Sequence, residues 1–210
     1  MSAQHNSLYI LGAGGHARVA IQTARLMGLH VAGLFDDNCS LEDQFVIGAP
    51  VMGPLGRLGE VMPLPCLIAI GDNERRAELA RRFPGPWATL VHPRAFVDDT
   101  AELGQGTIVM PGAVVNANAR IGEHAIINSN ATVEHDCRVG NAAHVSCNAC
   151  LTGGVSVGDQ SLIGAGAVIL PGVTVGREAR VAAGAVLTRA APDNATMCGV
   201  PARQMTSNRN

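Results

Sequence analysis

The chain has 210 residues, with 15 basic and 17 acidic side chains and a net charge of −2. This balance, without a cluster of basic and aromatic residues, does not favour nucleic-acid binding, and no apolar run reaches the length of a membrane span. Every basic residue is arginine, which excludes Schiff-base chemistry on lysine and the lysine of a phosphate-binding P-loop. The six cysteines, with no secretory signal pattern at the N-terminus, predict a cytoplasmic protein with reduced thiols.

The first half of the chain predicts a small Rossmann-like α/β domain. Residues 8–11 form an expected buried strand, and the glycine-rich turn Gly12-Ala13-Gly14-Gly15-His16 leads into an apolar-periodic helix that we expect to reach Met27. In this order of strand, turn and helix, glycines allow the backbone to approach a phosphate, and the helix N-terminus supplies N–H groups.

Acidic residues follow the next two predicted strands. The strand 31–35 ends at Asp36 and Asp37, and the strand 66–70 ends at Gly71, Asp72 and Asn73. Ligands of open parallel sheets bind at these carboxyl ends, so the pattern favours a single nucleotide over a purely structural sheet. The arginines that follow on an expected helix alternate with acids, and we interpret them as a solvated face: Arg75, Arg76, Arg81 and Arg82.

A six-residue repeat fills the second half. The fifth residue of each hexad is nearly always small, and an aliphatic anchor with this period predicts a parallel β-helix in which three hexads make one triangular coil. The first residues are all aliphatic: Val97, Leu103, Val109, Val115, Ile121, Ile127, Val133, Val139, Val145, Leu151, Val157, Ile163, Ile169, Val175, Val181 and Leu187.

Residues about 18 apart stack in such a coil. One predicted corner column therefore holds His135, Gly153 and Pro171, and a second holds Cys147, Ala165 and Ala183. The His135 imidazole should lie roughly 5 Å from the Gly153 backbone, the spacing of stacked strands. A histidine followed by a carboxylate, here Asp136, is the usual arrangement for a general base; the alternative is a pair of polar residues at a solvated turn.

The histidines and cysteines of the repeat raise the possibility of zinc. They are His124, His135, His144, Cys137, Cys147 and Cys150. Because the cysteines occupy different hexad positions, their side chains should diverge from a tetrahedron. We therefore expect no metal, and we expect Cys137 to be a small core residue. For His144 the alternative to a functional role is a side chain that faces solvent.

The motifs together resemble the hexapeptide-repeat nucleotide-sugar N-acetyltransferases of bacteria and the related sialic acid O-acetyltransferase-like proteins. The matching stretches are 12–16, Asp36-Asp37, 70–73, 134–140 with His144, and the tail 198–203. The resemblance implies a Rossmann-like domain over 1–95, a left-handed parallel β-helix over 96–190 and a C-terminal cap and tail over 191–210. It also implies a homotrimer with acetyl-CoA between adjacent columns.

The resemblance further implies a role for each residue. His135 would be the general base, Asp136 the carboxylate behind it, Gly153 the backbone donor to the oxyanion, and His144 the residue that meets the acetyl thioester. Backbone contacts to acetyl-CoA are implied at Ala165 and Ala183. Contacts to the nucleotide sugar are implied at Gly14, Gly15, His16, Asp36, Asp37 and Gly71.

The implied reaction is direct transfer of an acetyl group from acetyl-CoA to the 4-amino group of a 4-amino-4,6-dideoxy sugar, carried on uridine or a related diphosphate. Three alternatives stay open from the sequence. One is O-acetylation of a sialic acid or another sugar hydroxyl, another is a zinc hydratase on the same β-helix, and the third is a non-enzymatic scaffold.

Overall fold

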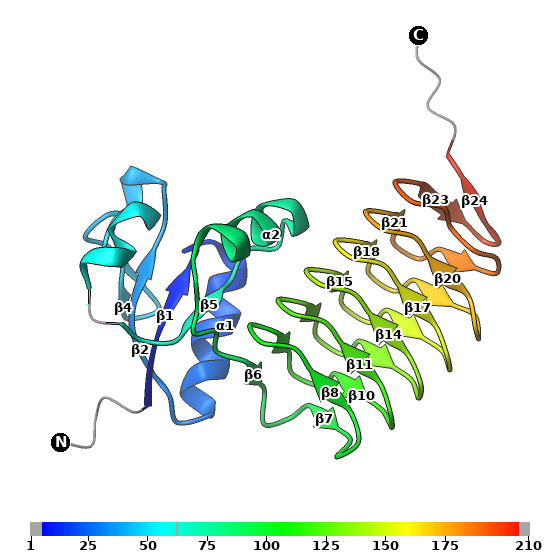
Figure 1. The fold of residues 1–210 in the computed structure, drawn as a ribbon, viewed down its shortest axis with the longest axis horizontal. Coiled ribbons are helices and arrows are strands. Elements are labelled where there is room, and N and C mark those ends of the chain that lie inside the picture. Colours follow the sequence, from blue (N-terminus) through cyan, green and yellow to red (C-terminus); the bar gives the residue numbers. More distant parts are fainter. Residues whose placement is uncertain (1–5, 62, 206–210) are drawn as a thin grey trace, which may run out of the picture.

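The computed structural model describes residues 6–61 and 63–205. Its N-terminal part is a three-stranded parallel sheet in the order β2-β1-β5, formed by β1 (Ser7–Leu11), β2 (His30–Phe35) and β5 (Cys66–Ile68) (Figure 1). Helix α1 (Gly15–Leu26) joins β1 to β2, and helix α2 (Asn73–Arg82) follows β5. Between β2 and β5 lie two short 3₁₀ helices, η2 (Cys39–Leu41) and η3 (Leu55–Glu60), and an antiparallel hairpin of β3 (Phe45–Val46) and β4 (Ala49–Pro50).

Local sequence explains where the two helices begin and end. The buried residues Ala17, Ala20, Ile21 and Ala24 recur every three or four positions, which gives α1 one apolar face. It ends at Leu26, and Gly28, just beyond the end, has a φ of 75°, the left-handed conformation that follows many helices. Helix α2 begins at an Asp72 cap, whose Oδ1 accepts the Arg75 N–H at 2.8 Å.

The second half is a parallel β-helix with three flat sides, consistent with the left-handed form (Figure 1). Sheet 1 has six strands: β7 (Phe96–Val97), β10 (Val114–Val115), β13 (Thr132–Val133), β16 (Cys150–Leu151), β19 (Val168–Ile169) and β22 (Val186–Leu187). Sheet 2 has five: β8 (Glu102–Leu103), β11 (Arg120–Ile121), β14 (Arg138–Val139), β17 (Ser156–Val157) and β20 (Thr174–Val175).

Sheet 3 is the longest side, with eight strands, because it also takes in strands before and after the repeat. These are β6 (Leu90–Val91), β9 (Ile108–Val109), β12 (Ile126–Ile127), β15 (His144–Val145), β18 (Leu162–Ile163), β21 (Arg180–Val181), β23 (Thr196–Gly199) and β24 (Ala202–Gln204). The last strand returns antiparallel to β23. Ala195, Met197 and Ala202 extend the buried core beyond the last hexad.

The hexad anchors are the second residues of these strands, and they fill the interior of the coil. Val115 pairs with Val133, and Val133 pairs with Leu151, so successive coils stack in the expected register. The fourth residue of a hexad turns the corner with a positive φ, as at Asn118 and Asp136, which explains why glycine and asparagine recur there. The predicted fold of a Rossmann-like domain followed by a β-helix is confirmed.

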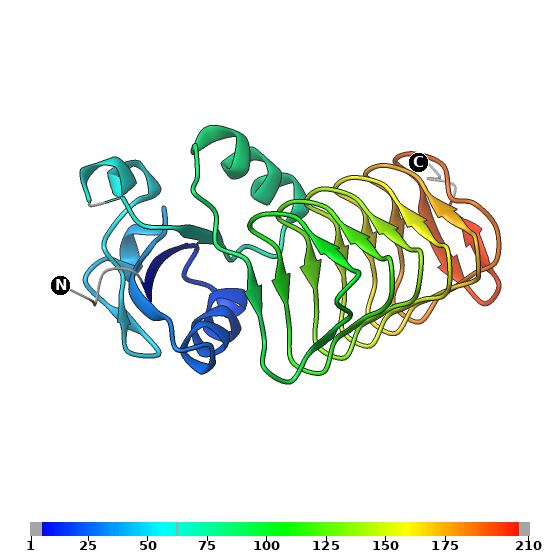
Figure 2. The ribbon, with the colours of Figure 1, turned by 60° about the horizontal axis from the view of Figure 1, so that its bottom comes forward.

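The two halves pack against each other along sheet 3. Leu90, Ile108 and Ile126 are buried on its outer side and share one core cluster with α1 and the N-terminal sheet. Helix α2 lies beside the first coils (Figure 2). The expected solvated face of this helix is wrong for Arg76, which is 0% exposed, because its guanidinium donates to backbone carbonyls of both halves, including those of Ile70 and His124.

Candidate active site

The predicted general base lies at the corner between sheets 1 and 2. His135 Nδ1 is 2.8 Å from Asp136 Oδ2, and both side chains are exposed, at 63% and 59%. The hydrogen bond that His135 donates to Asp136 raises the pKa of His135, and the charge of the same carboxylate acts in that direction. With Nδ1–H donated to the carboxylate, Nε2 of the neutral ring is free to accept a proton.

Gly153 lies under the His135 ring, as the column arithmetic predicted. A Cβ added to Gly153 would come within 2.6 Å of His135 Nε2, so only a glycine leaves the ring in place. The Gly153 carbonyl accepts the Gly172 N–H at 3.0 Å, whereas its own N–H has no acceptor among the described residues. A proton acceptor and an unused N–H donor therefore lie side by side at this corner.

The second column lies at the corner between sheets 3 and 1. Ala165 and Ala183 are exposed there, and a Cβ on Gly164 would come within 2.5 Å of the Ala183 nitrogen, which shows how closely the coils stack. Within the described chain, the N–H groups of Ala165 and Ala183 have no acceptor. They are free to bind an extended ligand that runs along the corner.

A third group lies where the N-terminal domain meets sheet 3. His144 Nε2 is 3.0 Å from Asn128 Nδ2, and its ring centroid is 6.5 Å from that of His16 in the first turn of α1. Burial, followed by the charge of Arg76, lowers the pKa of each histidine to about 4. Both rings are therefore neutral near pH 7, and His16 Nε2 is buried without a hydrogen-bond partner among the described residues.

This group unites residues that the sequence assigned to different ligands. His16 was predicted to contact the nucleotide sugar and His144 the acetyl thioester, and a backbone hydrogen bond with Gly71 acts on the pKa of His144. Asn128 was missed as a member of the site. Its only signal in the sequence was a polar residue directly after the anchor Ile127, a position that many solvent-facing residues share.

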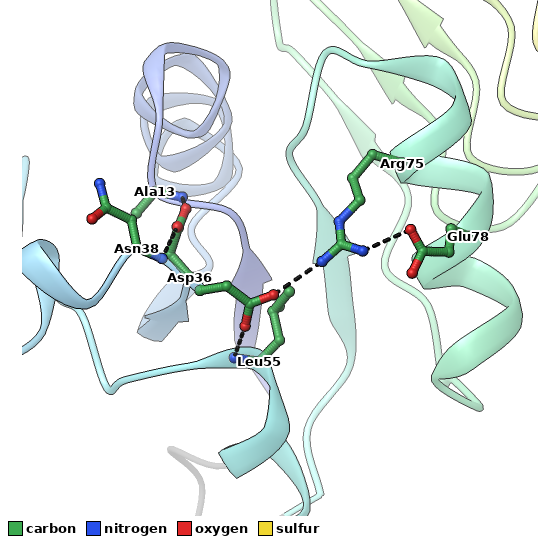
Figure 3. Close-up of polar contacts among 7 residues, drawn as sticks. Ala13, Asp36, Asn38, Leu55, Arg75 and Glu78 are labelled. Carbon is green, nitrogen blue, oxygen red and sulfur yellow. Dashed lines mark hydrogen bonds and ion pairs between the residues drawn. The ribbon is translucent and has the colours of Figure 1, made fainter.

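Gly12 and the two acids, together with Leu55, Ile70 and Arg75, line a cleft of about 110 Å³ in the N-terminal domain. Asp36 accepts the N–H groups of Ala13 at 2.7 Å and Asn38 at 2.9 Å. Figure 3 shows these hydrogen bonds together with the Arg75 guanidinium, which forms an ion pair with Glu78. Asp36 therefore holds the glycine turn in shape.

The second acid, Asp37, is also engaged by the protein. It accepts the Leu55 N–H at 3.0 Å and pairs with Arg75 at 3.0 Å. By contrast, a Cβ added to Gly14 or Gly15 would meet nothing within 4 Å. The space over these two glycines, at the N-terminus of α1, is open to a phosphate.

The cysteines do not form a metal site. Cys137 is 0% exposed, and its thiol donates to the Thr152 carbonyl at 3.2 Å, which confirms the expected core role. Within 6–61 and 63–205, no three His, Cys, Asp or Glu side chains are grouped so that they could hold a metal ion. In the same part of the chain, no helix is both long and apolar enough to cross a membrane.

Comparison with known proteins identifies the family. Residues 7–83 match the PglD N-terminal domain, residues 100–135 the bacterial transferase hexapeptide (six repeats), and residues 154–189 the hexapeptide repeat of succinyl-transferase. PerB from Caulobacter crescentus, solved with CoA and GDP-perosamine, is 39% identical with a TM-score of 0.90, over 95% of this chain and 97% of that chain. The chain belongs to the hexapeptide-repeat nucleotide-sugar N-acetyltransferases.

A second member of this family covers the chain equally well. The acetyltransferase domain of PglB from Neisseria gonorrhoeae FA1090, solved with acetyl coenzyme A, is 34% identical with a TM-score of 0.89, over 95% of this chain and 99% of that chain. The predicted class, an acetyl-CoA-dependent nucleotide-sugar N-acetyltransferase, is confirmed at the level of the family.

A curated relative matches only part of the chain. The uncharacterized protein L142 of Acanthamoeba polyphaga mimivirus is 26% identical over 100 residues, which are 47% of this chain and 20% of that protein. The chain thus spans about a fifth of the length of that relative.

Proposed function

We propose that this protein transfers an acetyl group from acetyl-CoA to the 4-amino group of a nucleotide-linked 4-amino-4,6-dideoxy sugar. The observation that carries the proposal is the His135–Asp136 pair over Gly153, in a chain whose near-full-length relative was solved with CoA and GDP-perosamine. We place the reaction in the cytoplasm, which the free thiols of the described cysteines support.

The chemistry is a direct transfer. The neutral sugar amine attacks the thioester carbonyl while His135 Nε2 takes the amine proton, a role typically worth about 10²–10⁴-fold in rate. The Gly153 N–H donates to the oxyanion of the tetrahedral intermediate, and one such donor contributes roughly 3 kcal/mol. The intermediate then expels the CoA thiolate, which takes the proton from the His135 imidazolium. No acyl-cysteine is formed.

One chain does not bring all parts of this site together. The His135 column lies at the corner between sheets 1 and 2, whereas the Ala165 column lies at the corner between sheets 3 and 1. The cleft beside Asp36 and Asp37, where we propose that the nucleotide sugar approaches, is in the N-terminal domain, which packs against the first strands of sheet 3. The two columns are therefore the opposite edges of sheet 1.

The outer face of sheet 1 supports a trimer that would complete the site. Its outward residues are mostly apolar, whereas those of sheet 2 are charged or hydroxylated, as at Glu102 and Arg120. Three copies arranged about an axis along sheet 1 would place the His135 corner of one subunit against the Ala165 corner of the next. The outward residues of sheet 1 are Phe96, Val114, Thr132, Cys150, Val168 and Val186.

The test is release of the CoA thiol by the purified protein with acetyl-CoA and a panel of acceptors. GDP-linked and UDP-linked 4-amino sugars stand beside free sialic acid. Release that depends on one amino sugar supports the proposal and identifies the nucleotide. Release only with sialic acid assigns O-acetylation instead, and no release with any acceptor contradicts the proposed function.

A further inference from the structure

Arg76, in the first half of α2, is a fully buried arginine. On one side its guanidinium holds the loop after β5: Nη1 donates to the carbonyls of Ile70 at 2.8 Å and Gly71 at 3.2 Å. Nη2 donates to Asn73 Oδ1 at 2.7 Å. This loop includes Gly71, for which a contact to the nucleotide sugar was predicted, and it runs directly into α2.

The other side of the same guanidinium binds the β-helix. Nε donates to the His124 carbonyl at 2.8 Å, and Nη2 donates to the Ala142 carbonyl at 2.7 Å. These carbonyls belong to two successive coils at one corner, and Ala142 lies two residues before His144. Arg76 thus connects the loop beside the nucleotide cleft to the coil that carries His144.

Asn73 extends the connection to a third coil. Its Nδ2 donates to the Gln160 and Ser161 carbonyls, each at 3.0 Å. His124, Ala142 and Gln160 occupy the same corner position in successive coils, as their hydrogen bonds to the preceding coil show. The first turn of α2 is therefore fixed along the β-helix as well as against it.

Stability alone does not explain a charged side chain at this place. The guanidinium donates only to carbonyl and amide oxygens, and Asp72 acts on it through its charge without a hydrogen bond to a carboxylate. Burial lowers the pKa of Arg76 to about 10, so it stays charged at neutral pH. Buried charges are costly, and well-packed apolar side chains often stabilise a protein as well or better.

We infer that Arg76 is a positioning residue for acetyl transfer, which sets the distance between the nucleotide-binding loop and His144. The inference rests on the proposed function. The sugar is held from the N-terminal domain and the acetyl group from the β-helix, so the amine meets the thioester only when the two halves keep one relative placement. A displacement of about 1 Å between reacting groups can cost about 10²-fold in rate.

The test compares Arg76→Met and Arg76→Lys with the matched control Arg82→Met, which alters an exposed arginine at the end of the same helix. We measure turnover, the separate dissociation constants of acetyl-CoA and GDP or UDP, and amide hydrogen exchange. For both Arg76 variants we expect turnover to fall by about 10²-fold, with each dissociation constant changed less than about threefold. Exchange should accelerate in residues 70–83 and stay unchanged in the coils, and Arg82→Met should match the wild type.

Several results would overturn the inference. Near-normal turnover of Arg76→Met, or near-normal turnover of Arg76→Lys, would show that the placement of the loop relative to His144 does not depend on the guanidinium. Faster exchange throughout the coils would show a purely structural role. If Arg76→Met does not fold, Asn73→Ala replaces it, with a smaller fall in turnover expected and no fall contradicting the inference. A wild-type protein without transferase activity fails the proposed function instead, and the exchange pattern still tests the local role of Arg76.

Discussion

Mixed trimers give the sharpest test of a site shared between subunits. His135→Ala removes the proposed base, and Ala165→Glu places a large anionic side chain on the exposed corner where acetyl-CoA is proposed to bind. Neither change touches the buried core, so both variants should fold. Each alone should lose activity, His135→Ala by about 10²–10⁴-fold.

The activity expected of a mixture of the two variants follows from where the two columns lie. They are opposite edges of sheet 1, so a site between subunits takes His135 from one copy and Ala165 from its neighbour. In a random equal mixture, each site has an intact His135 with a probability of one half and an intact Ala165 column with the same probability. About one quarter of the sites should therefore be intact over all closed trimers, and about one third in trimers that contain both variants, since a trimer of one variant has no intact site.

The assay is thiol release by co-expressed, differently tagged chains, purified through both tags so that only mixed oligomers are measured. Each variant is also co-expressed with itself as a control. Recovery of about one third of wild-type turnover is expected, because each closed trimer that contains both variants has one intact site among its three. Verified mixed oligomers with no more activity than either variant alone would refute the shared site, and a monomeric wild-type protein would refute the trimer itself.

Three further predictions concern individual groups. Asp136→Asn should lower turnover and move the acidic limb of the pH–rate profile to lower pH, because the carboxylate raises the pKa of His135. Gly153→Ala should lower turnover with acetyl-CoA affinity retained, measured by titration calorimetry, because its Cβ would displace the ring. The pKa values of His16 and His144 are both lowered to about 4, so the folded protein should lose stability as the pH falls from 6.5 toward 4. The loss should be on the order of 3 kcal/mol for each histidine, measured by thermal unfolding. A stability that does not change over this range would contradict the burial of the two rings.

The β-helix could be predicted closely because its period is a local property of the sequence. Each anchor pairs with a residue of the next coil, as Val115 does with Val133, so one set of contacts fixes all others by repetition. The contact between His135 and Gly153 followed from the same arithmetic. No further information was needed, since stacked coils have one register.

Contacts across the two halves could not be predicted in this way. Arg76 follows Arg75 and has Glu74 and Glu78 two residues away on either side, and nothing local distinguishes it from a solvated residue. Its burial arises because the β-helix corner presents carbonyls such as that of Ala142 to the first turns of α2. Asp36 shows the converse: its position at a strand end suggested a ligand, yet its oxygens hold the N–H groups of Ala13 and Asn38.

Environment also decides which histidine is suited to be the base. Both histidines belong to the repeat, and in the structure each has a polar partner, Asp136 for His135 and Asn128 for His144. His144 is half-buried near Arg76, its pKa is lowered to about 4, and so weak a base takes up a proton poorly near pH 7. The pKa of His135 is raised by Asp136, and general-base catalysis is most efficient when the pKa lies near the working pH. The geometry therefore supports proton transfer to His135 and leaves His144 a neutral hydrogen-bonding role.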